Sequence, residues 1–291
     1  MEYNPRARID LHIHSAASDG TLSPDEILTL ATRLHLGAIA ITDHDTVEGA
    51  KEALGIEKYP SLNFLAGVEI SASPLAAFQD SGPFHILGYG IDVNDPVLNE
   101  NLNILKTARR NRNPKIIGRL NALGVDLTMA AVVEDAGDTD QIGRPHVARL
   151  MVKKGFAKSI DDAFQTYLAV GKPAYVDKYR IDCDKVIGII KGAGGIPVLA
   201  HPFLLRLKKG ITLEDFITTL KSMGLGGIEA YCPDHSHDQT AQYIDIANRL
   251  DLLITGGTDF HGSLKPDVQM GTGIGDFFVS YSLYEKMTTG R

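Results

Sequence analysis

Short apolar runs beside histidine, aspartate or glutamate recur along this chain of 291 residues. Six of them read IDLHIH (9–14), IAITDHD (39–45), FLAGVE (64–69), FHILG (84–88), VLAH (198–201) and LITGGTDFH (253–261). Each run has the length and apolar character of a buried strand. Each also carries side chains that bind metal ions. Six such runs in one chain indicate a sheet whose strand ends share a rim, and that rim is suited to holding several metal ions.

The runs and the segments between them predict alternating strands and helices. Strands are expected over residues 8–14, 38–43, 63–70, 84–91, 196–200, 226–231 and 252–256. Helices are expected over residues 23–35, 46–54, 212–223 and 238–250. The first helix has a favoured N-cap in Ser23 and a favoured first residue in Pro24. Repeated strand–helix units predict an α/β fold, and seven strands favour a distorted (β/α)7 barrel over a regular eight-stranded one.

One strand is expected to run against the others. The link over residues 71–83 is too short and too rich in Gly, Pro and Ser for a crossover helix, so the strands on either side are expected to form an antiparallel hairpin. His85 supports this prediction, because it precedes its apolar run whereas most candidate ligands follow theirs. A reversed strand would begin at the rim where Glu69 ends its own strand.

Residues 95–180 interrupt the alternation with helical periodicity. Its apolar positions include Leu98, Leu102, Leu105, Ile116, Ile117, Leu120, Val147, Leu150 and Met151. Asn113-Pro114 and Gly124 are expected to interrupt these helices. A segment of this length far exceeds an ordinary connection. We therefore expect a barrel domain formed by residues 1–94 and 181–291, with a helical subdomain at 95–180 that covers the rim as a lid and lines the substrate pocket.

Charge and composition limit the classes of function. The chain has a net charge of −7, yet residues 95–180 hold 14 Lys and Arg against 10 Asp and Glu. An acidic body with a basic insertion fits a small anionic substrate better than a stable complex with long nucleic acid. No apolar run is long enough to span a membrane, and no signal-like segment precedes the first strand. Cys183 and Cys232 are the only cysteines, so a cytoplasmic protein without disulfides is expected.

Nine side chains at the expected strand ends are candidate metal ligands. His12 and His14 point to the same side of a strand, because residues two apart share a face. The full set is His12, His14, Asp19, His44, Glu69, His85, His201, Asp259 and His261. They suffice for three sites of three ligands, with Glu69 available as a bridge. Mixed imidazole and carboxylate ligands suit Mn, Fe or Zn, so two to three divalent ions are expected.

The motifs DLHIHS (10–15), ASDG (17–20), TDHD (42–45), GVEI (67–70), His85, His201-Pro202 and GTDFHG (257–262) strongly resemble those of the PHP (polymerase and histidinol phosphatase) phosphoesterases. Their order is most similar to the TrpH/YciV-like branch. The resemblance covers almost the whole chain and implies a (β/α)7 barrel with a trinuclear metal site. It implies one ion held by His12, His14, Glu69 and Asp259, a second by Glu69, His85 and His201, and a third by Asp19, His44 and His261.

Residues outside the ligand set are expected to bind the substrate phosphate. In the resembling branch a segment like GRPHVAR (143–149) lines the substrate pocket, which implies Arg144 and His146 as phosphate contacts. His235 fits the family's phosphate side better than His237 does. For Arg109, Arg110 and Arg112 we expect a solvated helix face, with phosphate contact as the alternative.

These features predict a hydrolase of nucleotide phosphate monoesters, acting on a nucleoside monophosphate or a 3′,5′-bisphosphate. The expected nucleophile is a metal-bridged hydroxide, and no single side chain is assigned as catalytic. Three alternatives remain open. They are a 5′→3′ exoribonuclease on short RNA, a histidinol-phosphate phosphatase, and a non-catalytic metal-binding regulatory module.

Overall fold

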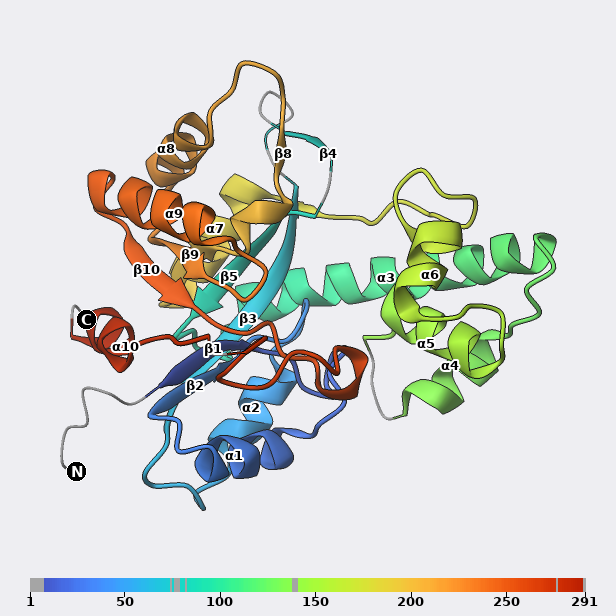
Figure 1. Ribbon diagram of the computed structural model, residues 1–291, viewed down its shortest axis with the longest axis horizontal. Coiled ribbons are helices and arrows are strands. Elements are labelled where there is room, and N and C mark those ends of the chain that lie inside the picture. Colours follow the sequence, from blue (N-terminus) through green and yellow to red (C-terminus); the bar gives the residue numbers. More distant parts are fainter. Residues whose placement is uncertain are drawn as a thin grey trace.

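The computed structural model describes residues 8–73, 75, 79–81, 83–137, 141–275 and 277–289. The main sheet has eight strands, seven of which follow one another in the order β1-β2-β3-β5-β7-β9-β10 (Figure 1). These strands are β1 (Ile9–Ile13), β2 (Ala38–Ile41), β3 (Asn63–Ser73), β5 (His85–Tyr89), β7 (Ile196–Leu199), β9 (Gly227–Tyr231) and β10 (Leu253–Gly256). All seven predicted strands are therefore present, with ends shifted by at most three residues.

The sheet is nearly closed on itself. A parallel bridge joins Ile13, at the end of β1, to Phe260, which follows β10. The backbone N–H of His14 donates to the Phe260 carbonyl at 2.9 Å, and the Phe260 N–H donates to the His12 carbonyl at 3.2 Å. These bonds bring the first and last strands together, so the fold is an α/β barrel of seven strands, as predicted.

Strand β5 is the reversed strand. It pairs antiparallel with β3 and with β7, whereas the other neighbours in the seven-strand order pair in parallel. His85 is the first residue of β5 and lies opposite Ser71 near the end of β3. The predicted hairpin is confirmed, and its consequence is that His85 reaches the same rim as Glu69.

Three short strands lie outside the predicted set. They are β4 (Gln79–Ser81), β6 (Ile181–Asp182) and β8 (Arg206–Leu207). β6 extends the pairing of β3, and β4 pairs with β8 in a small separate sheet. Runs of two or three residues carry no recognisable periodicity, which is why the sequence did not reveal them.

Helices α1 (Pro24–Arg33), α2 (Glu48–Leu54), α7 (Cys183–Gly192), α8 (Leu213–Met223), α9 (His237–Arg249) and α10 (Tyr281–Thr288) surround the barrel (Figure 1). Helix α1 begins as predicted, because Ser23 and Glu26 form a reciprocal capping box. It ends two residues before the predicted His35, whose backbone has a positive φ. Among the described residues, no helix is both long and apolar enough to cross a membrane.

The inserted segment forms a second lobe beside the barrel (Figure 1). It contains α3 (Pro96–Ala122), α4 (Met129–Ala136), α5 (Arg144–Lys153), α6 (Ile160–Ala163) and the π-helical turn η1 (Phe164–Leu168). Fourteen buried apolar residues between Ile116 and Ala174 form a core of their own. The first half of α3 packs into the barrel core through Leu98, Leu102 and Leu105. Helix α3 therefore belongs to both cores and ties the lobe to the barrel.

The predicted break at Pro114 is wrong, because α3 continues through that residue to Ala122. A proline inside a helix removes one backbone hydrogen bond and costs about 3 kcal/mol. Burial on either side offsets this cost. Asn113 is buried and its side-chain amide donates to the Ile142 carbonyl at 2.7 Å, while Ile116 and Ile117 pack in the core of the lobe. The predicted break near Gly124 is confirmed, since that glycine follows the helix with φ +83°.

Candidate metal centre

All nine predicted ligands converge at one rim of the barrel. They lie in or just after the strands: His12 in β1, His14 just after β1, His44 after β2, Glu69 in β3, His85 in β5, His201 after β7, and Asp259 and His261 after β10, with Asp19 on the loop after β1. All are buried except His44, His85 and Asp259, which are partly exposed. The parallel strands bring their ends to this rim, and the reversed β5 brings its start.

Glu69 lies at the centre of the cluster. Its Oε1 atom is 2.8 Å from His85 Nδ1 and 2.8 Å from His201 Nε2. Its Oε2 atom is 2.9 Å from His44 Nδ1, 3.3 Å from His14 Nε2 and 3.4 Å from His12 Nε2. Burial would raise the pKa of this carboxyl, but the surrounding imidazoles hold it well below its usual range. One carboxylate that faces five imidazoles through both oxygens has the geometry of a bridging ligand.

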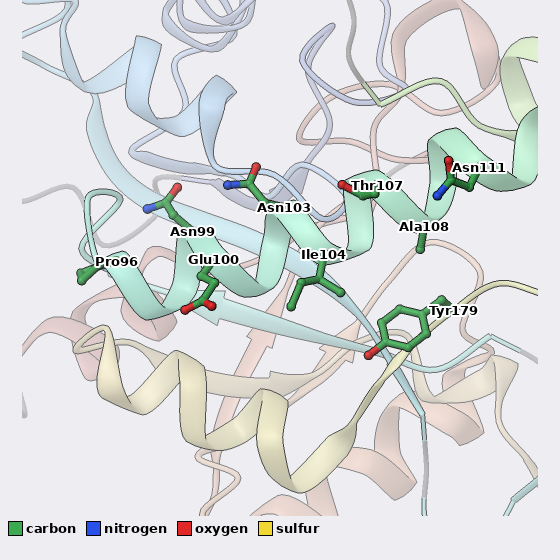
Figure 2. A pocket seen from close by; sticks show the side chains of 9 residues that line it. All are labelled: Pro96, Asn99, Glu100, Asn103, Ile104, Thr107, Ala108, Asn111 and Tyr179. Atoms are coloured by element: carbon green, nitrogen blue, oxygen red, sulfur yellow. The ribbon is translucent and has the colours of Figure 1, made fainter.

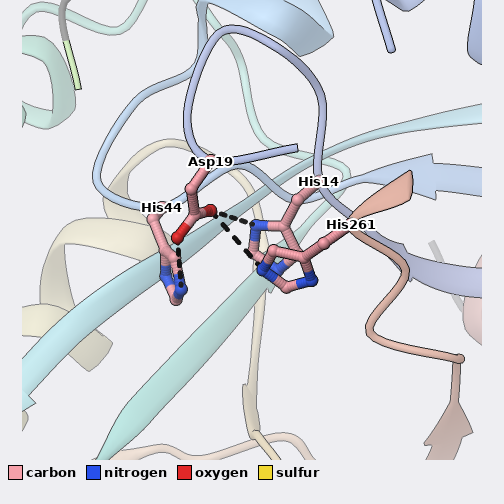
Figure 3. Close-up of side chains that lie close together, drawn as sticks. All are labelled: His14, Asp19, His44 and His261. Carbon is pink, nitrogen blue, oxygen red and sulfur yellow. Dashed lines mark ion pairs between the residues drawn. The ribbon is translucent and has the colours of Figure 1, made fainter. Parts of the chain in front are cut away.

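The nitrogen and oxygen atoms gather into three groups, in each of which the ligand atoms lie within 4.8 Å of one another. One is His12, His14, Glu69 and Asp259, another is His14, Asp19, His44 and His261, and the third is His44, Glu69 and His85. Figure 3 shows the group around Asp19, whose carboxylate faces three imidazoles. His201 also reaches Glu69 and lies 3.2 Å from His85 Nδ1.

Several buried polar atoms in this cluster lack hydrogen-bond partners. They are His12 Nε2, His14 Nδ1, His14 Nε2, Asp19 Oδ1, His44 Nδ1 and Glu69 Oε2. A buried polar atom without a partner costs about 1–3 kcal/mol, so a protein rarely keeps several together without a ligand. Carboxylate oxygens and one nitrogen of each neutral imidazole can offer lone pairs to a cation. The residues therefore fit divalent metal ions, which would bind the carboxylate oxygens and one nitrogen of each ring.

Carboxylates behind the cluster orient its ligands. Glu229 in β9 accepts from His12 Nδ1 at 2.8 Å and from the backbone N–H of His201 at 2.7 Å. The first contact leaves the Nε2 lone pair of His12 facing the cluster, which is the usual arrangement around a metal-binding histidine. Asp43 holds the loop that carries Asp19, because it accepts from Ser15 and Ser18 at 2.6–2.7 Å. The sequence predicts Glu229 within a strand and buried against a partner, and the structure identifies its partners as His12 and the backbone of His201.

The backbone at the rim is shaped for close approach. Asp45, His201 and Asp259 have φ values of +56°, +26° and +54°, which non-glycine residues rarely adopt. Gly257 has no room for a side chain, because a Cβ there would lie 2.3 Å from the backbone nitrogen of His12. The missing side chain at Gly257 lets the segment after β10 approach β1, so that Asp259 lies beside His12.

A cationic pocket of about 170 Å³ opens beside the cluster. His44, His85 and Asp19 of the cluster line it, together with five cationic side chains: Arg109, Arg112, Arg144, Lys178 and Arg180. Arg112 is 6% exposed, and its Nε and Nη1 have no hydrogen-bond partner among the described residues. Burial, with Arg109 and Arg144 nearby, lowers the pKa of Arg112 to about 10. A buried guanidinium facing other cations is the arrangement expected of an anion site.

The expected solvated face is wrong for Arg109 and Arg112, which are both buried and line this pocket. Arg110 is exposed, as expected. The sequence shows only the spacing of the arginines, and that spacing fits an exposed helix face. It does not show that the apolar residues on either side of them pack into two different cores, where Arg109 and Arg112 become buried. Lys178 and Arg180, which the sequence did not single out, alternate along an extended segment and both reach the pocket.

The three predicted phosphate contacts occupy different surroundings. Arg144 lines the cationic pocket and stacks against Phe164 and Tyr175. His146 is buried in the first turn of α5, where its Nδ1 accepts from the Gly143 N–H at 3.1 Å. His235 bonds the Ala230 carbonyl through Nδ1 at 2.9 Å. Neither histidine lines the cationic pocket.

A separate hollow lies along the outer face of α3 (Figure 2). Its lining includes Asn103, Ile104, Asn111 and Tyr179, and none of the nine candidate ligands contributes to it. Its residues are uncharged except for Glu100. It therefore lacks the cations of an anion site, whereas the candidate metal ligands and the five cations of the cationic pocket lie at the rim.

Known proteins share this arrangement. A 3′,5′-nucleoside bisphosphate phosphatase of Chromobacterium violaceum is 35% identical, and the match covers 88% of this chain and 87% of that one. A 5′-3′ exoribonuclease of Haemophilus influenzae is 32% identical, covering 87% and 90%. A solved structure from Bifidobacterium adolescentis superposes with a TM-score of 0.84 at 28% identity, covering 99% and 100%. The PHP domain model matches residues 10–172. The chain therefore belongs to the PHP domain family.

Proposed function

We propose that this protein is a metal-dependent phosphoesterase that removes a phosphate from a nucleotide carrying two phosphates, with a nucleoside 3′,5′-bisphosphate as the favoured substrate class. The observation that carries the proposal is Arg112, a buried cation whose Nε and Nη1 have no hydrogen-bond partner among the described residues, in a pocket that shares His44, His85 and Asp19 with the candidate metal centre. Two anion sites side by side suit a substrate with two phosphates. The name of the Chromobacterium violaceum relative supports the same substrate class.

The nine candidate ligands would hold two to three divalent ions, of Mn, Fe or Zn. We assign His12, His14, Glu69 and Asp259 to one ion. Glu69, His85 and His201 form the second site, and Asp19, His44 and His261 form the third. When bound, such ions supply a nucleophilic water at neutral pH and neutralise charge on the phosphoryl oxygens. Hydrogen bonds among the ligands and carboxylates fix these side chains before a substrate arrives.

The cationic pocket would bind the phosphate that is not cleaved. Arg112 and Arg144 offer guanidinium donors, which match phosphate oxygens in pairs. Asp45 already pairs with Arg109 and lies 3.2 Å from Lys178 Nζ, so these two cations are fixed in position. Residues 95–180 supply all five cations, and we propose that this segment acts as a lid that delivers them to the rim. We also propose His146 and His235 as contacts of a substrate phosphate.

The test is an assay of the metal-loaded protein with four substrates at equal concentration. They are a nucleoside 3′,5′-bisphosphate, the matching 5′-monophosphate, a 5′-phosphorylated short RNA and histidinol phosphate. We expect release of inorganic phosphate to be fastest from the bisphosphate. Faster turnover of histidinol phosphate, or no hydrolysis with Mn, Fe or Zn, would overturn the proposal.

A 5′→3′ exoribonuclease is the second candidate, favoured by the Haemophilus influenzae relative. In that reaction the cationic pocket would hold the terminal phosphate while the adjacent ester is cut. Stepwise shortening of the RNA without turnover of the bisphosphate would establish this function in place of the phosphatase.

A further inference from the structure

A second pocket, of about 700 Å³ and larger than the cationic pocket, also opens at the rim. His261 and Lys265 line it, and Lys265 bonds the candidate ligand Asp259, so the pocket reaches the metal centre. Its walls come from two parts of the chain. The insertion contributes Ile160 and Phe164, and the segment after β10 contributes further apolar residues, among them Ile274. Ile274 is 56% exposed, so its side chain is accessible to a molecule in the pocket.

The two pockets differ in charge. The smaller one has five cationic side chains and one aspartate. The larger one has three aspartates, Asp161, Asp234 and Asp267, against Lys265, which is already paired with Asp259. A phosphate entering the larger pocket would meet acidic side chains and apolar walls. An uncharged, flat group with hydrogen-bond donors fits these surroundings, because its faces pack on apolar side chains while its edges face carboxylates.

Phe164 and Pro145 connect the pockets, since both residues line both of them. The guanidinium of Arg144 lies 5.6 Å from the centre of the Phe164 ring. This contact fixes the aromatic ring beside the anion site on one side and the apolar pocket on the other. A molecule lying across these two residues would place its charged part and its uncharged part in different pockets.

We infer that the larger pocket binds the nucleobase of the substrate, against Phe164, Ile160 and Ile274, while the second phosphate occupies the cationic pocket. The inference rests on the proposed function and extends it by naming the part of the substrate that each pocket recognises. A base stacked on an aromatic side chain contributes about 1–3 kcal/mol of binding free energy. The base should therefore increase kcat/KM well above that of a substrate with both phosphates and no base.

The experiment compares adenosine 3′,5′-bisphosphate with its abasic analogue, in which a tetrahydrofuran ring carries the same two phosphates. Three variants of the metal-loaded protein are compared with wild type. Phe164→Leu and Ile274→Ser alter the pocket, and because Ile274 is exposed, its replacement should leave the fold intact. Ile104→Ser is the matched control, because Ile104 is a 44% exposed isoleucine in the hollow of Figure 2.

We expect Phe164→Leu and Ile274→Ser to lower kcat/KM for the adenosine substrate by at least about fivefold, as loss of about 1 kcal/mol requires. In Ile274→Ser, which alters only the larger pocket, turnover of the abasic analogue should change by less than about twofold. Phe164 also contacts Arg144, so Phe164→Leu should lower turnover of both substrates, with the larger loss on the adenosine substrate. Ile104→Ser should leave both substrates unaffected. Equal losses on both substrates, or no loss on either, would overturn the base pocket while leaving the phosphatase intact. Calorimetric titration with adenosine 5′-monophosphate against ribose 5-phosphate gives the same contrast without turnover. If wild type hydrolyses neither bisphosphate yet shows that contrast, only the proposed function fails.

Discussion

Asp45 shows how one residue outside the ligand set supports the site. Its carboxylate is fully buried, accepts from the Ser71 backbone N–H at 2.7 Å and Ser71 Oγ at 2.9 Å, and pairs with Arg109 and Lys178. Burial would raise the pKa of Asp45, but Lys178 and Arg109 hold it far below its usual range. A single carboxylate next to His44 thus fixes two cations that come from opposite ends of the insertion.

Replacing this carboxylate should destabilise the protein. In Asp45→Asn, Arg109 remains buried without its counter-charge, so we expect the free energy of unfolding to fall by about 3 kcal/mol. Urea denaturation of the apoprotein measures the change. Asp25→Asn is the control, since Asp25 pairs with Lys58 at the exposed surface and its loss should not be measurable. A similar stability for Asp45→Asn and Asp25→Asn would show that the buried pairs contribute nothing.

Lys178 should give the site a dependence on pH. Burial lowers the pKa of Lys178 to about 8, with Asp45 opposing the shift and Arg109 and Arg112 adding to it. Lys178 is therefore charged below about pH 8 and loses its charge as the pH rises above that value. We predict that KM for the bisphosphate increases from pH 7 to pH 9 in wild type, a range that lies below the pKa of about 10 of Arg112. In Lys178→Arg, which stays charged, the increase should disappear. Superimposable profiles would exclude Lys178 as the cause.

The convergence of the candidate ligands could be predicted from the sequence, and the residues that hold them in place could not. A candidate ligand such as His12 or Asp259 stands in or beside an apolar run, where its position and its residue type are both informative. Asp45 and Glu229 are equally buried, yet the same sequence signal does not separate a ligand from a residue that holds one. Lys178 reaches the pocket only because the chain returns to the barrel beside β3, and that path depends on packing between distant segments.

At the scale of elements, α3 brings two arginines to the cationic pocket. It begins against the barrel and ends in the core of the insertion, so its middle passes beside the metal centre. Arg109 and Arg112 face the pocket from this middle section, whereas Arg110 lies exposed between them. Neighbouring arginines on one helix thus have different surroundings, because successive residues point about 100° apart.

This difference provides a matched pair of variants. Arg112→Gln removes a buried cation from the pocket, and we expect KM for the bisphosphate to rise by about tenfold or more, since a hydrogen bond to a charged group contributes about 1.5–3 kcal/mol. KM for a nucleoside monophosphate should change little, because it lacks the second phosphate. Arg110→Gln should leave both constants unchanged. An equal rise in KM for both substrates would place the second phosphate elsewhere.

The strands were more predictable than the helices of the insertion. Each long strand has an apolar run bounded by turn residues, and the position of His85 even revealed the reversed direction of β5. The continuation of α3 through Pro114 could not be predicted, because local propensity disfavours it and only burial on both sides of the proline compensates. The short strands β4, β6 and β8 depend on pairing between distant segments, which leaves no local pattern.

At the scale of the whole molecule, the barrel and the insertion have separate tasks. The barrel supplies every candidate metal ligand, and the insertion supplies every cation of the small pocket. The two parts have separate apolar cores that α3 joins. The sequence shows an excess of basic residues in the insertion, and five of them line the pocket beside the candidate metal centre. Its precise placement required the three-dimensional path of the chain.

The most direct test of this account is the metal content of wild type and Glu69→Gln, measured by elemental analysis after loading with Mn and removal of free metal. His35→Asn serves as the control, because His35 is exposed and lies outside the cluster. The account predicts two to three ions per chain in wild type and in His35→Asn. It predicts fewer ions in Glu69→Gln, with a parallel loss of phosphate release. The same metal content and the same rate in all three proteins would contradict it.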